Sequence, residues 1–288
     1  MTPGFDCFIG IDWSGDNKPW QKGLKVAIAY PGRAAPRLEP CPAQHRGRWS
    51  RAEVMNWIED RFQDRRALIG FDFAFGFPPS ALAGNVVLDW EYVERMCAPY
   101  PNFYGGAFFR PPTCAHSHLV NSPWLPKHSY SADHLRMTEI VAKATVGARP
   151  QSVFNAVGPA QVGPSSISGM RALRSLQQNC GDRISIWPFG EVRRTGPVIV
   201  EIFPRYFPLS RGESARLAGH DELNAALAAF DSDGVVQGPE SEDEGDALLS
   251  AAALRALSTR QSLFRLPDLS IRSQGWIFGV PVPNERPS

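Results

Sequence analysis

The sequence predicts one α/β domain, residues 1–288, in which helices cover both faces of a mixed β-sheet. The first observation is length, because 288 residues suffice for a domain that buries roughly three quarters of its unfolded surface. The second is composition: 43% hydrophobic and 20% charged residues are typical of a globular protein and exclude a disordered chain. The third is the order of apolar segments, which starts with two strands, a helix and a strand, and ends with strands and helices.

The N-terminal part of the chain carries the strongest strand signals. Residues 8–13 and 24–30 are short apolar runs about ten residues apart, a spacing that favours an antiparallel hairpin. An edge strand at residues 37–42 is interrupted by prolines. Residues 51–64 have apolar positions at helical spacing, so we expect an amphipathic helix. A further strand, residues 68–75, stops where glycine and a pair of prolines follow.

A long irregular insertion is predicted at about residues 80–150. Within it, residues 89–96 and 131–144 have helical patterns. Residues 98–130 are dense in proline, glycine, histidine and aromatic side chains. Because long loops in compact domains are usually functional or disordered, and aromatic content argues against disorder, we expect residues 98–130 to form a lid or wall over the functional site.

The C-terminal part alternates helices and strands, with one polar, acidic connection. No internal repeat of 20–50 residues interrupts this order, which excludes a solenoid. The segments are a helix at 164–178, strands at 184–187 and 198–203, a helix at 221–230, the acidic connection at 231–242, an apolar helix at 247–257 and a strand-like piece at 275–280.

Charge and cysteine usage exclude several classes of protein. The net charge of +1 argues against a non-specific nucleic-acid coat protein, although a local basic groove is compatible with it. The apolar N-terminal run lacks a basic segment and is broken by Asp6 and Asp12, unlike a signal peptide. No window approaches the roughly 18 apolar residues that a membrane span needs. Five scattered cysteines without a Cys-x-x-Cys pair predict reduced thiols in a cytoplasmic protein.

Two predicted strands share the pattern Ile-Gly-apolar-Asp-aromatic, at residues 9–13 and 69–73. Alternate strand residues share a face, so each glycine clears space beside the following aspartate. On neighbouring strands Asp12 and Asp72 would lie about 5 Å apart, and two buried carboxylates that repel each other favour a bound cation. The alternative is that each aspartate opens a turn, which suits Asp12 better than Asp72 because apolar residues 73–75 continue the second run.

A third acid, Glu201, interrupts a strand of β-branched residues. A carboxylate in such a run is costly unless it is compensated. Two readings remain open for Glu201: it is a metal ligand, or it belongs to a buried ion pair with Arg205 or Arg193.

The apolar helix near the C-terminus begins with four acids. Ser241 and Glu244 have capping-box spacing, and Asp243 would lie in the first turn, where negative charge suits the helix dipole. Asp246 has no such explanation, because it follows the capping positions and precedes apolar residues. Asp243 and Asp246 share a helix face, which could present both carboxylates to the strand aspartates.

These acids carry a resemblance. An aspartate on the first strand, an acid on a later central strand and an Asp-x-x-Asp helix start resemble the ribonuclease H-like superfamily. More narrowly, the chain is similar to domain-of-unknown-function family 429, usually described as predicted ribonuclease H-fold nucleases. The similarity covers residues 8–30, 67–79 and 198–280, through the segments FIGIDWSG, LIGFDFAFGFPP, VIVEIFPR, DEGDALLSAAAL and GWIFGVP.

The resemblance implies a ribonuclease H-like fold and a divalent-metal-dependent phosphodiester hydrolase, a nuclease that uses Mg²⁺ or Mn²⁺. It implies that Asp12 binds catalytic metal, that Asp72 is the later-strand acid, where many superfamily nucleases have Glu, and that Asp246, with Asp243, is the helix acid. With two ions, Asp12 would bridge both, and Asp72 and Asp246 would each complete one. The resemblance assigns no role to Glu201.

Substrate binding is predicted for Ser14 and Arg110, with nucleic acid or a nucleotide as the partner. Arg110 would contact a phosphate while neighbouring aromatic rings stack on bases, or else those rings pack into a small core of the insertion. Two other functions are compatible with the same fold: a phosphotransferase or nucleotide hydrolase of the actin-like group, and a non-catalytic binding protein. The rings concerned are Phe103, Tyr104, Phe108, Phe109, Trp124 and Tyr130.

Overall fold

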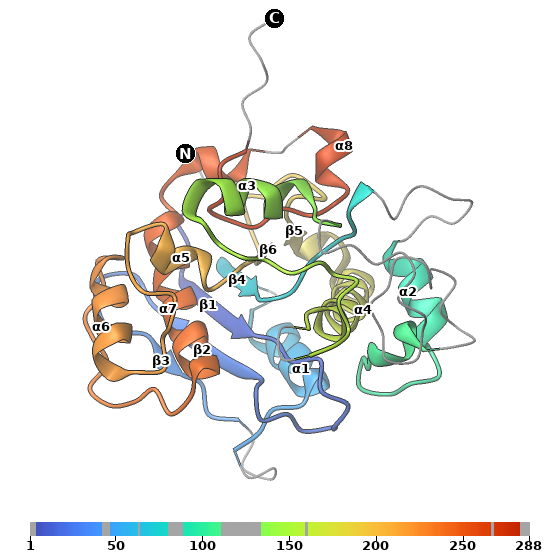
Figure 1. The fold of residues 1–288 in the computed structure, drawn as a ribbon, viewed down its shortest axis with the longest axis horizontal. Helices are drawn as coiled ribbons and strands as arrows, with labels where there is room; N and C mark the ends of the chain where they lie inside the picture. The colour runs from blue at the N-terminus through green and yellow to red at the C-terminus, as the bar shows by residue number, and fades with distance from the viewer. Residues whose placement is uncertain are drawn as a thin grey trace, which may run out of the picture.

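A six-stranded mixed β-sheet organises the chain, as a computed structural model shows for residues 4–41, 47–62, 64–79, 89–110, 134–158, 161–265 and 268–282 (Figure 1). The strand order is β3-β2-β1-β4-β6-β5. The first three strands pair antiparallel, and β1, β4, β6 and β5 run parallel. This confirms the predicted α/β class and mixed sheet. The strands are β1 (Cys7–Asp12), β2 (Lys25–Ala29), β3 (Arg37–Leu38), β4 (Ala67–Phe71), β5 (Ser185–Ile186) and β6 (Val198–Glu201).

Helices cover both faces of this sheet. Because strand side chains alternate, Phe8 and Leu68 pack on the face of α7, whereas Ile9 and Ile69 pack on the face of α1 and α4. The strands are buried on both faces by apolar side chains, so their sequences are nearly continuous hydrophobic runs. The helices are α1 (Arg51–Phe62), α2 (Trp90–Cys97), α3 (Met137–Val146), α4 (Gly163–Cys180), α5 (Tyr206–Leu209), α6 (His220–Ala228), α7 (Glu242–Leu257) and α8 (Leu269–Arg272), with short 3-10 turns η3 (Gly106–Phe109), η4 (Gly181–Arg183) and η5 (Gln261–Phe264).

Gly10 lets the backbone of α7 touch the backbone of β1. A Cβ at Gly10 would lie 2.4 Å from the carbonyl oxygen of Ala247 and 2.7 Å from the amide nitrogen of Ala251. At Gly70 it would lie 2.6 Å from the side chain of Ile202. The expectation that these glycines clear space for a carboxylate therefore needs correction: they admit a helix and an apolar side chain, and the helix carries its own acids to the strand ends.

The first part of the insertion packs into a third apolar cluster between α2, η3 and α4. Phe108 and Phe109 are 2% and 1% exposed and lie against Ile167 and Met170. Phe108 and Phe109 therefore pack in a small core of the insertion and are not available to stack on bases. Residues 111–133, with Trp124 and Tyr130, lie outside the described residues, so the predicted lid stays a prediction.

Several element boundaries differ from those predicted. The strand expected to reach residue 75 ends at Phe71, because the amide of Phe73 turns back to the carbonyl of Phe71 at 3.1 Å. The predicted strand at 275–280 is wrong: it makes a single bridge, from Ile277 to Glu201, and the positive φ angles of Gly275 and Gly279 break an extended chain.

The structure bears on two further predictions, that no segment spans a membrane and that the cysteines are free thiols. No helix in the described part of the chain has the length and apolar character that crossing a bilayer requires. Cys7, Cys41, Cys97 and Cys180 are free thiols, as expected, and Cys114 lies outside the described residues.

Candidate functional site

Asp12 and Asp72 meet at the carboxyl ends of two adjacent parallel strands. The register of β1 and β4 pairs Gly10 with Gly70, and the amide of Asp72 donates to the carbonyl of Ile11 at 3.0 Å. Asp12 and Asp72 are therefore level with each other on neighbouring strands. Both side chains are half-buried, so solvent reaches them.

The first turns of α7 bring two more carboxylates to this edge. Ala247 contacts Gly10, which places Asp246, the preceding residue, next to the end of β1. One turn earlier, Asp243 Oδ2 lies 3.3 Å from where a Cβ on Gly23 would stand, and Ser14 Oγ lies 3.9 Å from the same point. The structure thus gathers Asp12, Asp72, Asp246 and Asp243 into one group, which we call the aspartate cluster, with Ser14 at its rim.

Burial raises the pKa of Asp12 well above its usual range, and the charges of Asp72, Asp246 and Asp243 raise it further, against the opposing effect of Lys25. Each of these carboxylates therefore lies within the electrostatic field of Asp12. An aspartate in this setting resists ionisation because its charge is neither hydrated as in water nor matched by a cation.

The other cluster members behave alike. Burial raises the pKa of Asp72 well above its ordinary value, with further contributions from Asp246 and Glu201, while Arg205 opposes the shift. Burial raises the pKa of Asp246 to about 7, again against Arg205. Burial also raises the pKa of Asp243.

No member of the aspartate cluster forms an ion pair with a lysine or arginine among the described residues. Buried carboxylates are normally paired, so an unpaired group of four is costly and calls for a ligand. Strongly shifted pKa values with a physical cause also mark functional sites.

The donor set of the cluster suits a hard divalent cation. Carboxylate oxygens are the ligands that Mg²⁺ and Mn²⁺ prefer. Among the described residues, no three His, Cys, Asp or Glu side chains are grouped closely enough to form a ready-made cage around one ion. Mg²⁺ needs no such cage, because it keeps several waters and is usually held by one or two carboxylates together with substrate phosphates. The cluster fits an ion held in that way.

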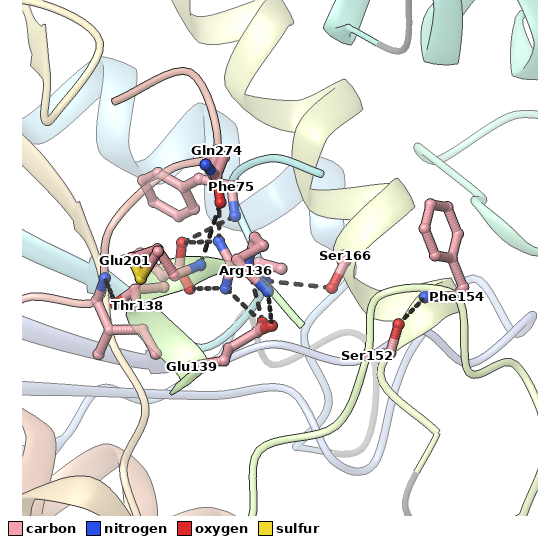
Figure 2. Close-up of polar contacts among 12 residues, drawn as sticks. Phe75, Arg136, Thr138, Glu139, Ser152, Phe154, Ser166, Glu201 and Gln274 are labelled. Atoms are coloured by element: carbon pink, nitrogen blue, oxygen red, sulfur yellow. Dashed lines mark hydrogen bonds and ion pairs between the residues drawn. The ribbon is translucent and has the colours of Figure 1, made fainter. Parts of the chain in front are cut away.

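Glu201 is held in an ion pair. Its Oε2 accepts from Arg136 Nη1 at 2.8 Å and from the amide of Phe75 at 3.0 Å, and its Oε1 accepts from Arg136 Nη2 (Figure 2). Arg136 also donates to Glu139 Oε1 at 2.9 Å. Of the two readings of Glu201, the structure shows the ion pair, and the partner is Arg136 in place of the predicted Arg205 or Arg193. Because both oxygens are occupied, the prediction of Glu201 as a metal ligand is not supported.

This ion pair holds the chain that follows Asp72. While Glu201 accepts from the amide of Phe75, Ser166 Oγ on α4 accepts from the amide of Ala74 at 3.1 Å. The indole of Trp90 donates to the carbonyl of Phe75 at 2.7 Å. The segment after β4 is thereby fixed by groups from β6, α4 and α2, and none of these contacts has a local sequence signal.

Glu244 only partly matches the predicted capping box. Ser241 Oγ accepts from the amide of Glu244 at 3.3 Å, as expected. The Glu244 carboxylate, however, accepts from the amide of Glu240 at 2.8 Å and pairs with Lys25 Nζ at 2.7 Å. The Glu244 carboxylate is therefore paired with Lys25 and is not part of the aspartate cluster.

Arg110 ends η3 at an exposed position, where its Nη2 donates to the hydroxyl of Tyr104 at 3.3 Å. Its predicted contact with a substrate phosphate stays a prediction, as does the predicted role of Ser14.

No protein-family model, no curated protein and no solved structure matches the chain. The resemblance to domain-of-unknown-function family 429 therefore stays a prediction.

Proposed function

We propose that the protein is a divalent-metal-dependent phosphodiester hydrolase with a ribonuclease H-like fold, acting on nucleic acid or a nucleotide with Mg²⁺ or Mn²⁺. One observation carries the proposal: Asp12, Asp72 and Asp246 share one electrostatic field at the ends of β1, β4 and the start of α7, without an ion pair among the described residues. An acid on the first strand, one on its parallel neighbour and one at a helix start is also the arrangement that the resemblance implies.

The position of each aspartate indicates which part of the metal site it would hold. The charges of Asp72 on β4 and of the acids of α7 all act on Asp12, so Asp12 is the residue that would share ions with both neighbours. Asp72 and Asp246 would each hold one side of the site. When bound, the ions would lower the pKa of an attacking water and stabilise the leaving oxygen. The network around Phe75 keeps the Asp72 side fixed while this happens.

The test is metal-dependent hydrolysis of bis(p-nitrophenyl) phosphate and of a short mixed-sequence oligonucleotide. The parent protein should cleave at least one of them with Mn²⁺ or Mg²⁺ and neither with chelator. Asp12→Asn should abolish cleavage and metal binding together, and Glu244→Gln should keep both. Absence of Mn²⁺ binding by the parent in calorimetry would overturn the proposal.

A further inference from the structure

Arg205 lies at the same edge of the sheet as the aspartate cluster. β6 runs beside β4, and the amide of Ile202 donates to the carbonyl of Phe71 at 2.9 Å, so the chain leaves β6 level with the end of β4. Arg205 is the fourth residue after the end of β6 and directly precedes α5. Tyr206 and Phe207 anchor α5 in the same apolar core as α7. Arg205 thus follows the strand next to that of Asp72 and begins a helix that packs in the same core as the helix of Asp246.

The charge of Arg205 acts on the cluster without neutralising it. It lowers the pKa values of Asp72 and Asp246, against the larger effect of burial. Its side chain is exposed, and among the described residues no carboxylate forms an ion pair with it. Arg136, by contrast, is buried and makes two ion pairs. Lys25, the cation on the other side of Asp12, is occupied by Glu244. Lys22 is a further exposed cation, and its charge acts on Asp243. Among the described residues, Arg205 is the cation that acts on Asp72 and Asp246, and its guanidinium is available to a ligand.

We propose that Arg205 binds the phosphate of the substrate on which the aspartate cluster acts. This inference depends on the proposed function and adds the residue that would bind the phosphate group of its substrate. A guanidinium presents donors in a fork that matches two phosphate oxygens, and it stays charged at every relevant pH. Once cations occupy the carboxylates, the attraction of Asp72 and Asp246 for Arg205 falls, which leaves the guanidinium to an incoming anion.

A competing explanation is that Arg205 serves only to offset the charge of the aspartate cluster and binds no phosphate. If Arg205 only offsets the negative charge of the cluster, its removal should leave phosphate affinity unchanged. Its removal should not weaken cation binding under either explanation, because a positive charge near the carboxylates repels the ion. The two explanations therefore separate on phosphate affinity, measured with Mn²⁺ present.

The experiment compares Arg205→Gln and Arg205→Lys with Arg194→Gln as the matched control. Arg194 is also exposed, but it precedes β6, at the opposite edge of the sheet from Arg205. Calorimetry measures Mn²⁺ affinity, then the affinity for inorganic phosphate at saturating Mn²⁺, and kinetics with bis(p-nitrophenyl) phosphate measure KM. Melting curves establish that each variant is folded.

Arg205→Gln should weaken phosphate binding and raise KM by about tenfold or more, while Mn²⁺ binding is unchanged or tighter. Arg205→Lys should lie between parent and Gln, because charge is kept and the fork is lost. Phosphate affinity within twofold of the parent in Arg205→Gln, or an equal loss in Arg194→Gln, would overturn the inference alone. Failure of the parent to bind Mn²⁺ overturns the proposed function and this inference together.

Discussion

Two groups of carboxylates lie near the same end of the sheet and differ in how deeply they are buried and in whether a cation is paired with them. Glu201 and Glu139 enclose Arg136, and each residue of this trio is at most 3% exposed. The aspartate cluster of Asp12, Asp72, Asp243 and Asp246 is half-buried and makes no ion pair among the described residues. Burial with a partner holds the fold together, whereas burial without one leaves a charge for a ligand to complete.

The electrostatics of the two groups follow from this difference. Although burial lowers the pKa of Arg136, the two glutamates more than offset it and raise that pKa overall. In the aspartate cluster the acids repel one another, so burial and repulsion raise the pKa of Asp12 in the same direction, and the charge of Lys25 opposes them without cancelling them. The charges of the trio are thus compensated within the protein, whereas we predict that bound cations compensate the charges of the aspartate cluster.

The largest expected effect is on the paired group. Arg136→Met should lower the free energy of unfolding by about 3–5 kcal/mol, because it leaves two buried glutamates without their cation. Urea denaturation followed by tryptophan fluorescence measures it. Arg194→Met is the control and should change stability by less than about 0.5 kcal/mol. A loss below about 1 kcal/mol for Arg136→Met would mean that the pair does not support the fold.

The unpaired group should respond in the opposite direction. Asp12→Asn and Asp72→Asn should leave the melting temperature of the metal-free protein unchanged or higher, because each removes a repelled, buried charge. Both should abolish activity. Melting curves in chelator measure the first effect. If both variants unfold instead, these carboxylates are structural and the comparison fails.

Metal should stabilise the parent through Asp246 and not through Glu244. At a Mn²⁺ concentration about a hundredfold above its dissociation constant, the melting temperature should rise by about 5 °C or more. Asp246→Asn should lose most of this rise, because an amide is a poor ligand for a hard cation.

Glu244→Gln is the matched control on the same helix. It loses the ion pair with Lys25 and should keep the full response to Mn²⁺. If Asp246→Asn and Glu244→Gln both respond as the parent does, Asp246 is not a ligand and the cluster loses its contribution from α7.

The smallest expected effect is on the pH dependence of the metal-free protein. The pKa of Asp246 rises from 3.8 to about 7 on folding, so the unfolded chain releases this proton at lower pH than the folded protein. The stability that protonated Asp246 contributes is present below pH 4 and is lost as the pH rises towards 7. Between pH 5 and 7 the melting temperature of the parent should fall more steeply than that of Asp246→Asn. If the melting temperatures of the parent and of Asp246→Asn fall equally with pH in chelator, the pKa of Asp246 is not raised.

The aspartate cluster was largely predictable from local patterns. A polar residue that interrupts an apolar run is visible without a structure, and this signal identifies Asp12, Asp72 and Asp246. Period-two and helical spacing also gave the hairpin and the helices, with boundaries within a few residues at most elements. The same signal identifies Glu201, and here it misleads, because an interrupted run shows only that a charge is buried and not whether a partner compensates it.

The sequence by itself determined most of the strands and helices and the burial of Asp12, Asp72, Asp246 and Glu201, because periodicity and cost of burial are local properties. It did not identify the buried Glu139. Only the tertiary structure decided which of those carboxylates are paired. Arg136 reaches Glu201 across 65 positions of the chain, and Gly10 meets α7 across more than 230. Arg205 is adjacent in sequence to the strand of Glu201, yet it acts on Asp72 and Asp246. Such pairings depend on how strands and helices pack, and packing brings together residues whose spacing along the chain carries no signal.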